Sequence, residues 1–144
     1  MGIGESLQEA LVNANNERIN WHDAVQDLDG ELVELRATLR SAETKKAGAD
    51  SIHKAADEKY HELLAFSNNS MDQDGKRALG PQIEVLAGNV NFTVGSVREA
   101  GEEVQRRRRE MEKVEKQRTV AQLNLNAATE RWEQIKKQIA ELRQ

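Results

Sequence analysis

The chain has 144 residues, of which 32% are charged and only 3% aromatic, and its formal net charge is -4. A chain this short fits one domain, it has too few large apolar residues for a typical compact globule, and its charge excludes an overall basic nucleic-acid binder. The absence of cysteine excludes disulfides, thiolate nucleophiles and cysteine-ligated zinc.

The first predicted element is a helix over residues 3–67. Apolar residues recur there alternately every four and every three positions, which is a heptad rhythm. Only Arg18, Lys46 and His53 interrupt its apolar character. The row comprises Leu7, Leu11, Ala14, Arg18, Trp21, Val25, Leu28, Leu32, Leu35, Leu39, Ala42, Lys46, Ala49, His53, Ala56, Tyr60 and Leu63.

The rhythm stops over residues 68–81, which we predict to form a bend. This segment contains the turn formers Gly75 and Gly80 and ends at Pro81, the only proline of the chain. When the flanking arms are paired antiparallel, the residue numbers of matched apolar positions sum to 149 or 150. The pivot is then expected at Gly75, and Arg18 is expected to lie against Trp132.

The second predicted helix covers residues 82–144. Its apolar row comprises Ile83, Ala87, Val90, Val94, Val97, Gly101, Val104, Arg108, Met111, Val114, Arg118, Ala121, Leu125, Ala128, Trp132, Ile135, Ile139 and Leu142. Two steps of three residues follow each other between Arg108 and Val114, and such a stammer locally overwinds a coiled coil. Residues 88–101 are rich in glycine, asparagine and β-branched residues, so a short strand stays open as an alternative there.

Together these elements predict an all-α fold, a long antiparallel two-helix coiled-coil hairpin, with pairing of two hairpins into a four-helix bundle as a further option. We expect residues 1–144 to form one domain. The first residues lack the basic region and apolar stretch of a classical signal peptide, and no apolar run approaches the roughly 20 residues of a membrane span. A cytoplasmic location without a transmembrane segment is therefore expected.

Apolar residues outside the two rows predict a partner. Val12, Ile19 and Val33 share one heptad position, and the others gather toward the bend: Leu64, Met71, Leu79, Leu86 and Phe92. Because a two-helix hairpin needs only a narrow buried stripe, a widened stripe favours a further helix, from a second copy or from another protein.

A non-enzymatic interaction protein is the function that this pattern favours, namely a scaffold, adaptor or chaperone of a larger assembly such as a secretion or phage apparatus. The predicted architecture resembles that of export-apparatus stalk proteins and type VII secretion substrates. The Trp-x-Gly turn of the latter family is absent from residues 68–81.

The alternative function is binding of nucleic acid or phosphate by a belt of basic residues. Arg106, Arg107, Arg109 and Lys113 lie in the second arm, and the pairing places Lys45 opposite them. Four consecutive arginines, 106–109, wrap a full helical turn instead of lining one face, and no aromatic residues interleave with them to stack on bases.

The sequence gives little indication of a catalytic site or a metal site. His53, Asp57 and His61 are spaced by four residues and share one helix face, yet no fourth ligand is evident. No arrangement of serine, histidine and acid suggests a nucleophile, and a two-helix hairpin offers no deep pocket. We therefore expect neither a catalytic site nor a metal or cofactor.

Overall fold

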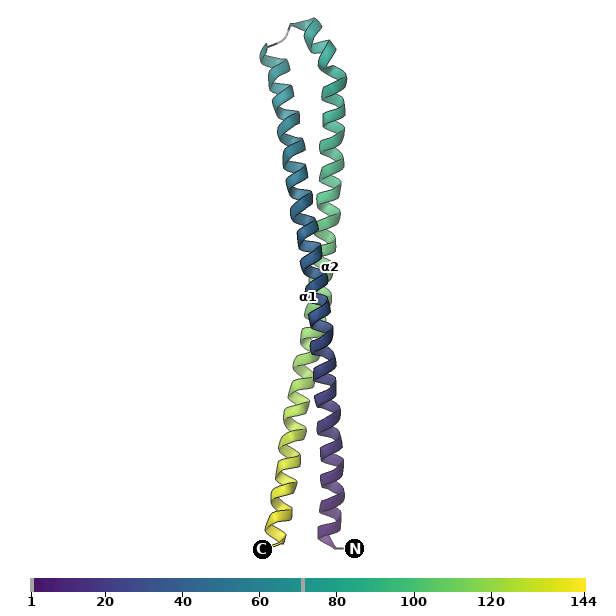
Figure 1. Ribbon diagram of the computed structural model, residues 1–144, viewed down its shortest axis with the longest axis vertical. Coiled ribbons are helices and arrows are strands. Elements are labelled where there is room, and N and C mark those ends of the chain that lie inside the picture. The colour runs from purple at the N-terminus through teal and green to yellow at the C-terminus, as the bar shows by residue number, and fades with distance from the viewer. Residues whose placement is uncertain (1, 71) are drawn as a thin grey trace. The chain divides into compact units, whose positions relative to one another are not determined.

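The computed structural model describes residues 2–70 and 72–144, which form two helices, α1 (Ile3–Ser70) and α2 (Gln73–Leu142). The helices are antiparallel and pack against each other, as Figure 1 shows. The described residues contain no strand, and residues 88–101 are helical throughout. The predicted all-α helical hairpin is confirmed.

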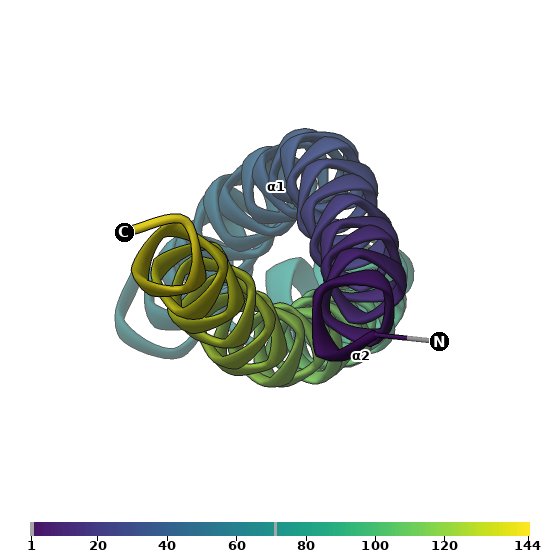
Figure 2. The same ribbon diagram turned by 90° about the horizontal axis from the view of Figure 1, so that it is seen from below.

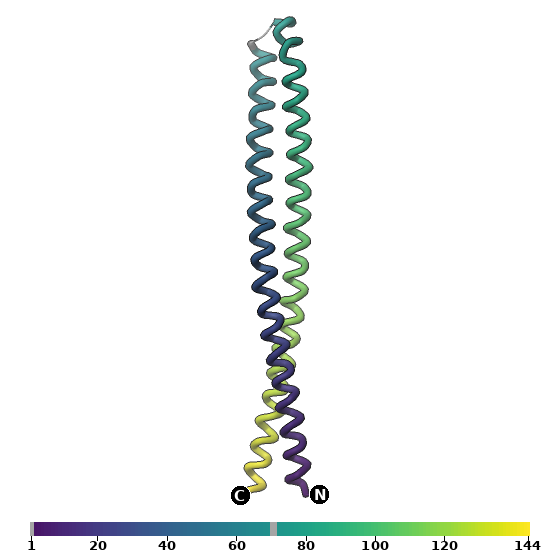
Figure 3. The backbone as a smooth tube through the Cα atoms, turned by 45° about the vertical axis from the view of Figure 1, so that its right-hand side comes forward, coloured from purple at the N-terminus to yellow at the C-terminus, as the bar shows by residue number. Residues whose placement is uncertain are grey.

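The hairpin consists of two compact units, and each unit contains a stretch of both helices. The terminal unit consists of Met1–Arg36 and Arg109–Gln144, and the bend unit consists of Ala37–Arg108. The start of α1 and the end of α2 belong to the terminal unit, and both are nearest the viewer in Figure 2. In the bend unit α1 and α2 lie side by side down from the bend, which is best followed in Figure 3.

The predicted apolar row of α1 is the face that packs. Every member from Leu7 to Leu63 is buried or half-buried, including Arg18, Lys46 and His53. The row continues for one more step to Ser67, which is 3% exposed. The heptad rhythm thus predicted the packed face of α1 correctly from Leu7 to Leu63.

The packed row of α2 differs from the prediction in its middle. Val94 and Arg108 are exposed, whereas Thr93 and Val104 are buried and Ala100 and Arg107 are half-buried. The row therefore runs from Val90 through Thr93, Val97, Ala100, Val104, Arg107 and Met111 to Val114 in alternating steps of three and four. The predicted stammer is wrong. The row passes through Thr93 instead of Val94, and therefore through Arg107 instead of Arg108, so two steps of three residues never follow each other.

The break between the helices is shorter than the predicted bend at 68–81. Asp72 caps α2, because its Oδ1 accepts a hydrogen bond from the backbone N–H of Gly75 at 2.8 Å. Gly75 and Pro81 both lie inside α2. Proline removes one helical hydrogen bond, to the carbonyl of Arg77, and this loss is tolerated where that turn of the helix faces water. Both Arg77 and Pro81 are exposed.

The pairing register of the two helices differs from the expected one, because α1 ends and α2 begins before the predicted pivot at Gly75. In the bend unit the numbers of the hydrogen-bonded pair His53 and Thr93 sum to 146, and those of the two most buried apolar residues, Ala42 and Val104, also sum to 146. In the terminal unit Leu32 and Val114 give the same value. The expected sum of 149 or 150 is therefore off by about one helical turn.

The terminal unit contains the predicted contact between Arg18 and Trp132. The guanidinium carbon of Arg18 lies 4.5 Å from the centroid of the indole, and Lys136 Nζ lies 4.1 Å from it. Arg18 also donates hydrogen bonds to Asn15 Oδ1. The side chain of a helical residue leans toward the N-terminus of its helix, and in an antiparallel pair this tilt brings Arg18 and Trp132 toward each other although their numbers sum to 150.

Candidate interaction surfaces

The terminal unit exposes a second apolar row on α1. Val12, Ile19 and Val33 are 57%, 41% and 64% exposed. Their spacing is a multiple of seven, so all three lie at one heptad position beside the packed row. Isolated exposed aliphatic residues are common on any protein, but an aligned set is typical of helix-packing surfaces.

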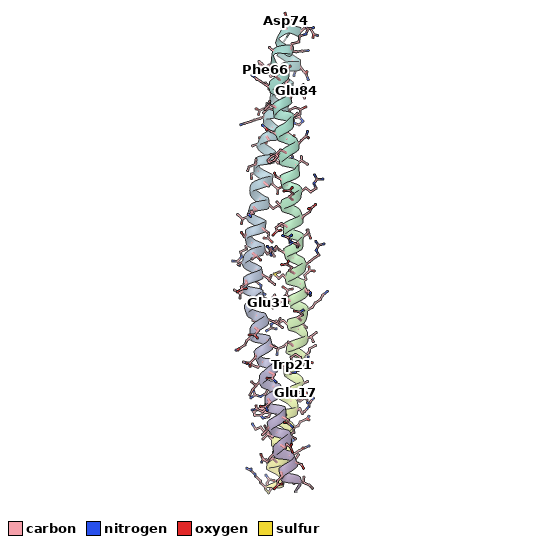
Figure 4. All side chains as sticks on the ribbon, turned by 90° about the vertical axis from the view of Figure 1, so that its right-hand side faces the viewer. Glu17, Trp21, Glu31, Phe66, Asp74 and Glu84 are labelled. Carbon is pink, nitrogen blue, oxygen red and sulfur yellow. The ribbon has the colours of Figure 1, made fainter. Side chains whose placement is uncertain are left out.

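The bend unit exposes larger apolar side chains. Ile52 and Phe66 project from α1, and Val85 and Phe92 project from α2, with Phe92 76% exposed. Figure 4 labels Phe66 near the bend, among side chains that stand on the outside of the helices. Of these four residues, sequence reasoning identified only Phe92. Ile52 and Phe66 are two heptads apart, and this spacing could have been recognised.

A hollow opens beside these residues. It has a volume of about 410 Å³ and is lined by Leu63 of α1 and by Pro81, Gln82, Val85 and Leu86 of α2. None of the described residues that line it is charged. The hollow is a place where an apolar side chain of a packing helix could insert.

The other described residues that we predicted to contact a partner are half-buried within the hairpin. Leu79 and Leu86 are half-buried members of the row of α2 that faces α1, and Leu64 is half-buried on α1. Met71 lies outside the described residues. The hairpin itself therefore uses much of the apolar surface of Leu79 and Leu86, while Val12, Ile19, Val33 and Phe92 remain available.

The basic residues are engaged in local ion pairs in the bend unit. Arg106 and Arg107 both bond to Glu103, Arg107 through Nε to Oε1 at 2.9 Å, and Arg108 lies 3.8 Å from Glu43. A polar hollow of about 190 Å³ has Lys45 and Arg107 in its lining, together with Glu103. The carboxylate of Glu103 would repel a bound phosphate, so this arrangement weakens the predicted phosphate site.

Arg109 and Lys113, the other two predicted phosphate ligands, belong to the terminal unit and are exposed. Nearby in that unit, Arg118 donates through Nε to Asp29 Oδ1 at 2.7 Å. This hydrogen bond, and then the charge of Asp29, raise the pKa of the Arg118 guanidinium. Arg118 thus has a carboxylate partner of its own.

Of the three residues weighed as metal ligands, only Asp57 and His61 lie close together, with 3.3 Å between Asp57 Oδ1 and His61 Nδ1. His53 points to Thr93, at 2.9 Å between Nδ1 and Oγ1, whereas His61 Nδ1 lies 2.8 Å from the carbonyl oxygen of Asp57. Across residues 2–70 and 72–144, no group of three or more histidine or acidic side chains could hold a metal ion.

Comparison with known proteins adds no assignment, since no family model, curated protein or solved structure matches the chain. Neither α1 nor α2, within the described residues, contains a segment apolar enough to cross a membrane. Inferences about function therefore rest on the exposed surfaces of the two units.

Proposed function

We propose that the chain is a non-enzymatic interaction protein that acts by coiled-coil-like packing of its helices against a partner helix. The observation that carries this proposal is the exposed row of Val12, Ile19 and Val33 on α1 of the terminal unit. The hairpin already buries one heptad row of α1, so the second row is available for another helix. A scaffold, adaptor or chaperone of a larger assembly would use such a surface.

Apolar surface elsewhere in the terminal unit also favours a partner. In the same unit Val120 and Leu123 of α2 are 57% and 62% exposed. An open hollow of about 460 Å³ lies between Trp21, Ala24 and Leu28 of α1 and Val120 of α2. A partner helix that covered these positions would remove apolar surface from water at about 25 cal/mol per Å².

Site-specific photocrosslinking tests the proposal. A photoreactive side chain at Val12, Ile19 or Val33 should crosslink to one defined protein in cells that make the chain, because these positions face the partner. The matched control is Asn16, an exposed polar residue on the same stretch of α1. Equal yields at all four positions would contradict the proposal.

Salt dependence separates this function from phosphate or nucleic-acid binding. Apolar helix packing should change little between 50 and 500 mM salt, whereas contacts to phosphate weaken steeply as salt is added. If the recovered partner were a nucleic acid, and if its binding vanished on charge reversal of Arg109 and Lys113, the alternative function would replace the one proposed.

A further inference from the structure

In the bend unit, α2 carries a second heptad row outside the row that packs on α1. This outer row comprises Ala78, Pro81, Val85, Gly88, Phe92 and Gly95. Its spacing of three, four, three, four and three residues matches that of the packed row. All six residues are uncharged, and all except the half-buried Gly95 are exposed. Between residues 78 and 95 α2 therefore has two packing faces, of which α1 covers one.

The glycines of the outer row have no explanation within the hairpin. Glycine is a poor helix former, and neither Gly88 nor Gly95 has a positive φ. A Cβ built at either position would meet nothing within 4 Å. Glycine on a helix surface permits the close approach of another backbone, so a helix from outside the hairpin would account for both residues.

The outer row contains both protrusions and places that can receive them. Val85 and Phe92 project, at 63% and 76% exposure, whereas Ala78, Gly88 and Gly95 have little or no side chain. The hollow beside Leu63 and Leu86 has Pro81 and Val85 in its lining, so it borders the same row. A surface that carries both parts of a fit is self-complementary, as in an isologous interface.

We propose that a second copy of this chain packs antiparallel on the outer row, about a twofold axis near residues 86 and 87. In this pairing the numbers of facing residues sum to 173. Phe92 of each copy then meets Pro81 and the hollow of the other, Val85 meets Gly88, and Ala78 meets Gly95. Val85 then lies against a glycine and Phe92 lies beside the hollow, whereas parallel pairing would place Phe92 against Phe92.

The chemistry of the row favours a second copy over a charged client. A row without charge cannot select a partner by electrostatic complementarity, so recognition depends on shape. The row extends about 26 Å along the helix, from the helical rise per residue. One narrow contact of that length is smaller than a standard interface, so we expect a dimer that dissociates on dilution. This inference rests on the proposed function, because it gives helix packing a specific partner.

Sedimentation equilibrium of the purified full chain tests the dimer. We expect the average mass to rise from monomer to dimer with concentration, with little dependence on salt. Phe92→Ser should weaken dimerisation on the order of 100-fold, because both copies lose their largest protrusion. Circular dichroism should show unchanged helicity, since Phe92 is exposed.

A substitution that strengthens the helix separates dimerisation from folding. Gly88→Leu should weaken dimerisation at least tenfold, since Val85 of the other copy needs the space, while it raises the melting temperature of the monomer. Gly30→Leu is the matched control, because Gly30 also has open space beside its Cβ. It should raise the melting temperature and leave dimerisation unchanged.

Disulfide formation reads the register, because the chain contains no cysteine. A mixture of Val85→Cys and Gly88→Cys chains should form the mixed disulfide faster than either disulfide between identical chains. Faster formation of the 85–85 and 88–88 disulfides would indicate parallel pairing and overturn the proposed arrangement.

The outcomes distinguish this inference from the proposed function. A monomer at every concentration overturns the inference, and the photocrosslinking at Val12, Ile19 and Val33 still decides the proposed function. A dimer that Ile19→Asp disrupts and Phe92→Ser does not would also overturn the inference while supporting the proposed function.

Discussion

The terminal unit and the bend unit share one heptad spacing but differ in the residues that they bury at the packed positions. Among the described residues, six of the eight buried apolar residues lie in the terminal unit, and only Ala42 and Val104 lie in the bend unit. The two buried polar residues, Ser67 and Thr93, both lie in the bend unit. The interface between α1 and α2 in the bend unit therefore buries fewer apolar residues and more polar ones, and the phenylalanines of this unit stay exposed.

From this difference in burial we expect the two units to differ in stability, although one heptad row runs through both. Leu32 and Val114 give the terminal unit substantial aliphatic burial, and Arg131 pairs with Glu17 across its helices at 2.6 Å. On α1 of the bend unit, Ala42, Ala49 and Ala56 occupy the heptad position that Leu28 and Leu35 occupy in the terminal unit, and Lys46 and His53 occupy that of Leu32. Because small side chains bury little area, we expect the bend unit to open more easily and to gain more from a partner.

The largest expected effect comes from the core of the terminal unit. Leu32→Ala should lower the free energy of unfolding by about 3 kcal/mol, because it removes buried methyl groups and leaves a cavity. Chemical denaturation followed by circular dichroism measures this. Leu123→Ala, at an exposed position, should stay within about 0.5 kcal/mol. Equal effects of the two substitutions would mean that Leu32 is not in a core.

An intermediate effect is expected at the polar pair of the bend unit. The Thr93 hydroxyl donates to the carbonyl of Val90 at 2.9 Å, so His53 Nδ1 must donate to Thr93. Thr93→Val should lower the free energy of unfolding by about 1 to 2 kcal/mol, because the Nδ1–H of His53 then lacks its acceptor.

The double substitution His53→Leu with Thr93→Val provides the control for that experiment. Both polar groups are then gone, and we expect the lost stability to be largely recovered. If the double variant were as unstable as Thr93→Val alone, the hydrogen bond would not be what holds these two positions together.

The smallest effect is expected for the ion pair between Glu17 and Arg131. Both side chains are about half exposed, so a double-mutant cycle with Glu17→Gln and Arg131→Gln should give a coupling of about 0.2 to 1 kcal/mol that declines with salt. A salt-independent coupling above this range would show that the pair is shielded from water.

Sequence periodicity predicted the helices and the packed row of α1, because the four-three spacing of α1 continues unchanged through its three polar members, Arg18, Lys46 and His53. It failed where hydrophobicity alone chose Val94 over Thr93, since the hydrogen bond that lets Thr93 pack depends on His53, 40 residues away. It also misplaced the bend, because Gly75 and Pro81 are turn formers in isolation and the cap at Asp72 starts the helix before them.

The candidate surface was predictable only in part. The exposed row of Val12, Ile19 and Val33 follows from counting heptads, and the structure shows that these residues are accessible. The outer row of α2 was not recognised, because half of its members are glycine or proline and carry no apolar signal. These residues share one helix face only if the helix continues through Pro81, which the structure shows.

Amide hydrogen exchange at two protein concentrations, well below and well above the dimerisation midpoint, tests the contrast between the units most directly. We expect protection in the terminal unit to be high and the same at both concentrations, and protection of residues 78–95 to rise with concentration. Unchanged protection of residues 78–95, or a rise confined to the terminal unit, would contradict the assignment of the outer row as a packing surface.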